Sequence, residues 1–363
     1  MTFLALASLP YFEMDPIALQ IGPIAIRWYA LSYIAGIVGG WFYIAHLLKH
    51  PTLWRNDLNG VMSGQPPMSR DQLDDLVFWI TLGILLGGRL GYVTFYEPDL
   101  FLKPWEPLMT GQGILQTLLG WIYIPPAIMV WHGGMSFHGG LIGVALAGYF
   151  YCRKNGLGVL RVADLLALAA PIGLFFGRIA NFINAELYGR PTDGPLGMVF
   201  PEYYDYGRDQ WVYADDAVAR HPSQLYEAAL EGLVLFMILV IASRVWNILR
   251  QPGAATGIFL MGYGIARTIV ENFREPDAFM PDFPLGLTMG MMLSLPMVIL
   301  GLWLFLLNRR PAKPAPKQDI KAKSSLSGDV VDSKAGHNSP GSKKEPNENS
   351  QEDKVTPSKS TKS

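Results

Sequence analysis

Polar residues of a kind that bind anions follow one of the most apolar parts of this chain. Residues 177–189, GRIANFINAELYG, contain Arg178, Asn181, Asn184 and Glu186. An arginine at the bilayer centre costs about 2.5–3.5 kcal/mol on insertion scales, and such residues usually face a bundle interior or a cavity. The planar fork of a guanidinium matches phosphate oxygens. The stretch therefore indicates a cationic site for an anionic ligand.

Helical spacing groups these polar residues. At 100° per residue, Arg178 and Asn181 share a face, and Gly189 lies close to it if the helix continues. In residues 254–273 and just beyond, Arg267, Glu271 and Arg274 fall within about 60° of one another. Three polar residues also line up at i, i+3 and i+7 on one segment: Gln224, Glu227 and Glu231.

Two interpretations of these charges remain open. They could pair with one another to fix helix register, as Arg267 with Glu271, and Arg89 could be structural too. The ligand-site interpretation is favoured because cations outnumber obvious partners and because the polar residues gather toward the outer halves of their helices. A headgroup-level pocket that opens outward suits an anionic lipid headgroup.

In a second constellation, WHGGMSFHGGLIG at residues 131–143, the glycine pairs at 133–134 and 139–140 flank His132, Ser136 and His138. Glycine lets backbone or ligand approach closely, and a histidine can act as a base near neutral pH. For both histidines, a simple hydrogen bond to a carbonyl remains an alternative. A serine hydrolase is disfavoured, because residues at i and i+2 cannot easily make the nucleophile–base hydrogen bond.

The elements that must position these residues are membrane helices. The 363-residue chain is 50% hydrophobic and 16% charged, whereas soluble proteins average about 25% charged residues. A helix that crosses hydrocarbon about 30 Å thick needs roughly 20 apolar residues. We predict an all-α, polytopic membrane protein with seven spans: 24–46, 73–95, 138–152, 162–183, 222–243, 254–273 and 286–307.

Loop charges predict the orientation of these spans, because Lys and Arg accumulate on the cytoplasmic side. The loops that follow the first, third and fifth spans are basic, whereas 184–220 is acidic. The N-terminus should therefore lie outside and the C-terminus in the cytoplasm. Residues 113–137 are predicted to be re-entrant or interfacial, because a further crossing would place the basic loop 153–161 outside.

The chain should comprise a transmembrane catalytic domain, residues 1–310, and a disordered polar tail, residues 311–363, which is too poor in apolar residues to fold. The net charge of −1 argues against nucleic-acid binding. Cys152 is the single cysteine, which excludes an internal disulfide and a cysteine metal cluster. We expect no metal and no cofactor.

The motifs resemble those of the prolipoprotein diacylglyceryl transferase family. The signature Gly-Arg-x-x-Asn-Phe-x-Asn-x-Glu-x-x-Gly is matched at residues 177–189. Over residues 10–308, five further stretches agree in the family's order: FEMDPIALQIGPIAIRWYALSY, GGRLGYVTFY, GGMSFHGGLIG, RHPSQLYEAALEG and GYGIARTIVENFREPD. Ala30 and His132 depart from the usual pattern, and His132 places a second imidazole near the site, as an alternative base to His138.

The resemblance implies a bacterial inner-membrane enzyme with seven spans. It would transfer the diacylglyceryl group of phosphatidylglycerol to the lipobox cysteine in the signal peptide of a prolipoprotein, leaving glycerol 1-phosphate. It implies essential roles for eight residues: Tyr29, His138, Arg178, Asn181, Glu186, Gly189, Arg267 and Glu271. We expect His138, Arg178 and Arg267 to be catalytic and the others, with Arg178, to bind substrate. A transporter for an anionic solute is the main rival, but it predicts polar residues in the inner leaflet, where LLALAAPIGLFF is apolar.

Overall fold

The computed structural model describes most of the chain up to Leu307. The described residues are 9–21, 24–54, 65–108, 117, 119–130, 133–275 and 288–307. They all belong to one unit, Met1–Lys313. His132 and the tail 311–363 lie outside the described residues, so the tail remains a prediction.

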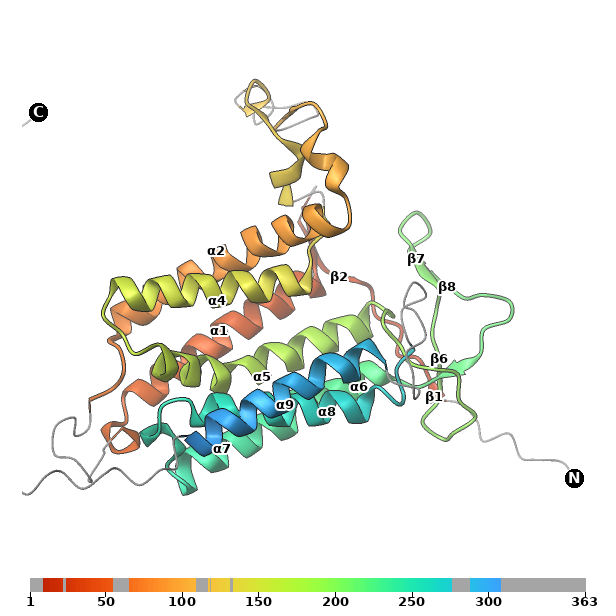
Figure 1. Cartoon of the computed structure of the whole chain (residues 1–363). Helices are drawn as coiled ribbons and strands as arrows, with labels where there is room; N and C mark the ends of the chain where they lie inside the picture. Colours follow the sequence, from red (N-terminus) through yellow and green to blue (C-terminus); the bar gives the residue numbers. More distant parts are fainter. Residues whose placement is uncertain are drawn as a thin grey trace, which may run out of the picture. The chain divides into compact units, whose positions relative to one another are not determined.

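Helices run side by side through this unit (Figure 1). They are α1 (Trp28–Leu48), α2 (Arg70–Phe95), α4 (Phe137–Lys154), α5 (Val159–Ile183), α6 (Ser223–Glu227), α7 (Leu235–Val245), α8 (Ala254–Val270) and α9 (Met289–Leu307). A π-helical turn, Ala228–Val234, joins α6 to α7. Each of the seven predicted spans therefore contains a helix.

Five helical runs among the described residues are long and apolar enough to cross a membrane. They are α1, α2, α5, α9 and the run Ser223–Val245. Helix α8 is a shorter apolar helix of 17 residues, and α4 has 18 residues that end in Arg153 and Lys154. The prediction of a mostly helical, multi-pass membrane protein is confirmed.

The helix bounds differ by a few residues from the approximate span bounds predicted above, as two examples show. The first predicted span began at residue 24, but Ile24–Arg27 form strand β3, which pairs with β2 (Ile17–Ile21). Hydropathy cannot separate a short β-branched strand from the start of a helix. The sixth was predicted to reach residue 273, but α8 ends at Val270 and a turn follows.

Short strands organise the loops. Strand β1 (Leu9–Pro10) pairs with β6 (Met198–Val199), which also pairs with β9 (Ala219–Arg220), and β7 (Tyr203–Asp205) pairs with β8 (Gln210–Val212). Strand β4 (Glu106–Pro107) pairs with β5 (Tyr123–Ile124). Figure 1 shows β1, β6, β7 and β8 at one end of the helices. The described part of residues 113–137 holds β5, a short 3-10 helix (Pro126–Ile128) and the start of α4, with no further membrane-length helix.

The main apolar core lies toward the other end of the helices. It joins the last turns of α1 to the first turns of α2, α5 and α8, with fully buried Leu47, Leu73 and Leu165 among its members. Asp164 on α5 fixes the start of α8 there, because its carboxylate accepts hydrogen bonds from Gly253 N at 2.6 Å and Thr256 N at 2.8 Å. The core thus sets the relative positions of the helices whose opposite ends carry the polar residues.

Candidate functional site

Three helix ends bring their charged residues together near the strands. Arg178 lies in the last two turns of α5, Glu227 at the end of α6, and Arg267 in the last turn of α8. Arg274 reaches the same place from the turn beyond α8, so it does not lie on the helical face that its spacing predicted. We call Arg178, Glu227, Arg267, Glu271 and Arg274 the arginine–carboxylate cluster.

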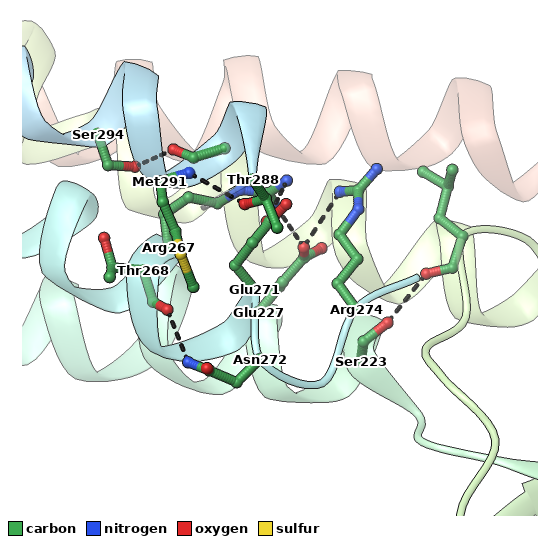
Figure 2. Close-up of polar contacts among 12 residues, drawn as sticks. Ser223, Glu227, Arg267, Thr268, Glu271, Asn272, Arg274, Thr288, Met291 and Ser294 are labelled. Carbon is green, nitrogen blue, oxygen red and sulfur yellow. Dashed lines mark hydrogen bonds and ion pairs between the residues drawn. The ribbon is translucent and has the colours of Figure 1, made fainter. Parts of the chain in front are cut away.

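Glu227 is the carboxylate that the three arginines share. Its Oε2 lies 2.7 Å from Arg178 Nε, and its Oε1 lies 2.5 Å from Arg267 Nη1 and 3.4 Å from Arg274 Nη1. Figure 2 shows the Glu227 side chain between those of Arg267 and Arg274. Its side chain is 1% exposed, whereas the arginine side chains are 14–18% exposed. The carboxylate is therefore buried, and the guanidinium groups keep some accessible surface.

The pairing interpretation left open above is correct for Arg267 and Glu271, whose Nη2 and Oε2 lie 3.0 Å apart. Within the cluster, three arginines face two carboxylates, so the cations outnumber their partners as expected, and Glu227 pairs with all three of them. Sequence spacing could not reveal this sharing, since the partners come from helices far apart in the chain. The partial exposure of the arginines leaves room for a ligand as well.

Asn181 links Arg178 to two other residues of the predicted site. Its side-chain oxygen accepts from Arg178 Nη1 at 3.4 Å. Its side-chain nitrogen lies 2.8 Å from the Tyr29 hydroxyl and 2.7 Å from Glu186 Oε1. The Arg178–Asn181 face that helical spacing predicted is thereby confirmed. Six of the predicted residues form one connected network through Glu227: Tyr29, Arg178, Asn181, Glu186, Arg267 and Glu271.

The chain turns sharply after α5. The helix ends at Ile183, so Gly189 does not continue its face, as it would in a longer helix. Ala185 and Leu187 have φ values of 52° and 57°, a left-handed region that costs non-glycine residues about 1–3 kcal/mol. Buried Ser223 and Gln224 hold this turn: Ser223 Oγ donates to Leu187 O at 3.0 Å, and Gln224 Nε2 donates to Glu186 O at 2.7 Å.

Gly189 is packed between two backbone segments. Its N–H donates to His221 O at 2.8 Å, and its neighbour Arg190 N donates to Phe273 O at 2.9 Å. A Cβ at this position would collide with Phe273 O and lie 3.0 Å from the His221 Cβ. Glycine is therefore required to hold the turn that carries Arg274. Burial lowers the pKa of the His221 imidazole.

Among the described residues, no hydrogen bond or ion pair links His138 or Arg89 to the arginine–carboxylate cluster. His138 is exposed in the first turn of α4, and in the described part of the chain no hydrogen bond or ion pair joins it to Arg178 or Arg267. Arg89 is buried and donates to the carbonyl oxygens of Pro126, Ala127, Gly133 and Gly134. Arg89 therefore fixes the loop before α4 onto α2, which supports its structural interpretation.

Sequence reasoning missed the importance of three residues in the RHPSQLYE stretch. Glu227 was noted only for its helical spacing, and Ser223 and Gln224 were not connected with the turn after α5. A signal was present: side chains capable of hydrogen bonding sit at the start of an apolar span. Their buried partners come from another helix end, however, so only the structure reveals them.

Fold and site define a multi-pass membrane protein with a buried arginine–carboxylate cluster at one end of its helices. A family model described as "Prolipoprotein diacylglyceryl transferase" matches residues 16–307. The phosphatidylglycerol–prolipoprotein diacylglyceryl transferase of Phenylobacterium zucineum (strain HLK1) is 47% identical over 306 residues, 84% of this chain and 96% of that protein. The protein of the same name from Rhodospirillum rubrum is 49% identical over 310 residues, 85% of this chain and 97% of that protein. The chain belongs to the prolipoprotein diacylglyceryl transferase family.

Proposed function

We propose that this chain transfers the diacylglyceryl group of phosphatidylglycerol to the cysteine thiol of a prolipoprotein lipobox. A thioether forms and glycerol 1-phosphate leaves. The observation that carries this proposal is the family match over residues 16–307, which contains the whole arginine–carboxylate cluster. The transporter and hydrolase alternatives receive no support from it.

Arg178 and Arg267 act on the phosphodiester. As the glycerol carbon–oxygen bond breaks, its electron pair passes to a phosphate oxygen, and negative charge develops there. Preorganised guanidinium groups stabilise such charge strongly in a site with little water. Their partial exposure, in contrast to buried Glu227, supports this role because each retains surface for a ligand.

The remaining predicted residues orient these groups or the headgroup. Tyr29 and Glu186 meet at Asn181, which contacts Arg178, and Glu271 pairs with Arg267. Gly189 acts through packing, because it holds the turn that carries Arg274. Substrate binding by these residues is our proposal, supported by their connection to the two arginines.

His138 accepts the thiol proton in this scheme, and the resulting thiolate attacks the glycerol carbon. Its exposed position at the start of α4 leaves it accessible to a substrate. We expect His138→Asn to slow transfer at neutral pH and to recover as the pH rises toward 9, because a free cysteine ionises near pH 8.5 without help. Initial rates between pH 6 and 9 measure this, and a pH profile like that of the unmodified enzyme contradicts the base role.

The protein is proposed to lie in the plasma membrane of a bacterium, with its N-terminus outside and its C-terminus in the cytoplasm. The support is the alternation of basic and acidic loops along the sequence. In this orientation the arginine–carboxylate cluster lies toward the outer leaflet, where a secreted prolipoprotein emerges.

Mass spectrometry of a synthetic acceptor tests the function. Purified protein in phosphatidylglycerol vesicles is incubated with a lipobox peptide, and the expected result is one diacylglyceryl group on the cysteine. A peptide with serine in place of cysteine is the control for thiol attachment, and phosphatidylethanolamine vesicles test donor choice. Unmodified peptide after incubation with folded protein contradicts the proposal.

A further inference from the structure

Glu227 has contacts that the reaction proposed above does not explain. It is the member of the cluster that joins its two halves: Arg178, with Asn181 and Tyr29, on one side, and Arg267, with Glu271, on the other. The two arginines come from α5 and α8 and lie 89 positions apart in the sequence. The core fixes these two helices toward their other ends, and Glu227 contacts both guanidinium groups directly.

Glu227 lies behind the two arginines and contacts both of them. Each carboxylate oxygen takes a different catalytic arginine: Oε2 lies 2.7 Å from Arg178 Nε, and Oε1 lies 2.5 Å from Arg267 Nη1. Since Glu227 is 1% exposed and the arginines are 14–18% exposed, it contacts them from the protein side. The other guanidinium nitrogens contact different residues: Arg178 Nη1 donates to Asn181, Arg178 Nη2 lies 3.9 Å from Glu231, and Arg267 Nη2 pairs with Glu271.

Electrostatics requires such a group. Guanidinium groups gathered in a low-dielectric site repel one another, and an anion between them offsets this repulsion. Without it, the arginines would separate whenever no phosphate is bound and would have to be gathered again in each turnover. A preorganised site avoids that reorganisation.

We propose that Glu227 is the positioning residue of the transferase: it holds the guanidinium groups of Arg178 and Arg267 at the separation that the phosphodiester needs. This inference rests on the proposed function, because it assumes that those arginines bind the donor's phosphate. Glu227 does not itself touch the substrate. It acts through the arginines, and Arg274 strengthens the arrangement as a third ion-pair partner.

Glu227→Gln tests this with a separation of kcat from KM. We expect kcat to fall about 100-fold, because the arginines are no longer preorganised. KM for phosphatidylglycerol should stay the same or fall, because the site gains one unit of net positive charge. Rates are normalised to the concentration of folded enzyme, so misfolding alone does not lower the measured kcat. A kcat like that of the parent enzyme overturns the proposal, whether KM is unchanged or raised.

Glu231→Gln is the matched control. Glu231 lies one turn further along the same helical run and is also fully buried, but its nearest arginine contact is 3.9 Å, from Oε2 to Arg178 Nη2. Because that distance is beyond hydrogen-bond range, Glu231→Gln should keep kcat within about threefold of the parent. An equal loss in both variants would mean that buried charge, rather than position, matters, and would overturn the proposal.

Two further measurements keep the test decisive if Glu227→Gln does not fold. Glu227→Asp keeps the charge but has a side chain one methylene shorter, and its kcat should fall about tenfold with KM unchanged. Full activity overturns the proposal.

In an Arg267→Lys background, replacing Glu227 by Asp should lower kcat much less than it does alone, because the shared contact is already lost. Additive losses contradict the proposal. If the unmodified enzyme transfers no lipid in this assay, the proposed function fails instead.

Discussion

At the scale of single residues, Arg178 shows why a guanidinium rather than a simple positive charge is needed. Its Nε lies against Glu227, and its Nη1 bonds Asn181. The planar fork lets one side chain meet two partners in fixed directions and still present an edge to a phosphate. A lysine would offer a single flexible ammonium group at the same place.

We expect Arg178→Lys to lower kcat/KM at least about 100-fold, although the protein still folds in the membrane, because charge is kept but the fork is lost. The assay is lipid transfer to the lipobox peptide, with thermal unfolding as the check on folding. Arg208→Lys is the control, since the Arg208 side chain is 76% exposed and pairs with nearby Asp205. Near-normal turnover by Arg178→Lys would count against bidentate phosphate binding.

The predictability of site residues depended on how local their contacts are. Helical spacing was enough to predict that Arg178 meets Asn181 and that Arg267 meets Glu271, because three or four residues separate each pair. It could not reveal Glu227 as the shared partner, or the packing of Gly189 against Phe273, because those contacts join distant segments. Their positions follow from how α5, α6 and α8 pack.

At the scale of elements, glycines on two helices permit a close approach. Gly83, Gly87 and Gly91 on α2 and Gly139 and Gly143 on α4 each recur at intervals of four residues, and a Cβ on Gly143 would collide with Gly83 O. Small residues at such spacing let membrane helices pack backbone to backbone. This packing positions the start of α4, which carries His138. The sequence suggested only that glycines allow close approach, without naming α2 as the partner.

Gly143→Ala should therefore destabilise the protein by about 1–3 kcal/mol, because α2 and α4 must separate to admit the methyl group. Gly148→Ala is a matched control on the same helix, where a Cβ meets no atom within 4 Å. It should be neutral or stabilising, because alanine favours a helix more than glycine does. Thermal unfolding in detergent compares the two variants. Equal stability would contradict the prediction, because it would show that α2 and α4 separate at little cost in free energy.

Segment type was predictable and segment ends were not. Among the described residues, each of the seven predicted spans contains a helical segment, because hydropathy indicates which residues can face lipid. Strand β3, the π-helical turn at Ala228–Val234 and the end of α8 at Val270 could not be inferred, because pairing with β2 and contacts between helices decide them. These three features lie next to Tyr29, Glu227 and Glu271, where contacts with other segments, rather than local sequence preference, determine the backbone conformation.

At the scale of the whole molecule, the described chain separates apolar and polar parts along its helices. The main core joins the ends that carry Leu47 and Leu165, and the arginine–carboxylate cluster lies at the ends near the strands. Basic loops flank the former end and an acidic segment, 184–220, follows the latter. If the positive-inside rule holds, the cluster faces the outer leaflet and can meet a secreted acceptor.

Cysteine labelling tests that orientation. In a Cys152→Ala background, cysteines replace exposed Asp216, in the acidic segment, or exposed Lys154, in the basic loop after α4. A membrane-impermeant maleimide applied to spheroplasts should label the Asp216→Cys protein directly, because its loop lies outside. The Lys154→Cys protein should be labelled only after permeabilisation, which also shows that its thiol is reactive. The opposite pattern would place the cluster at the cytoplasmic leaflet, where a thiol on a secreted protein could not reach it after export, and would overturn the proposed route of the acceptor.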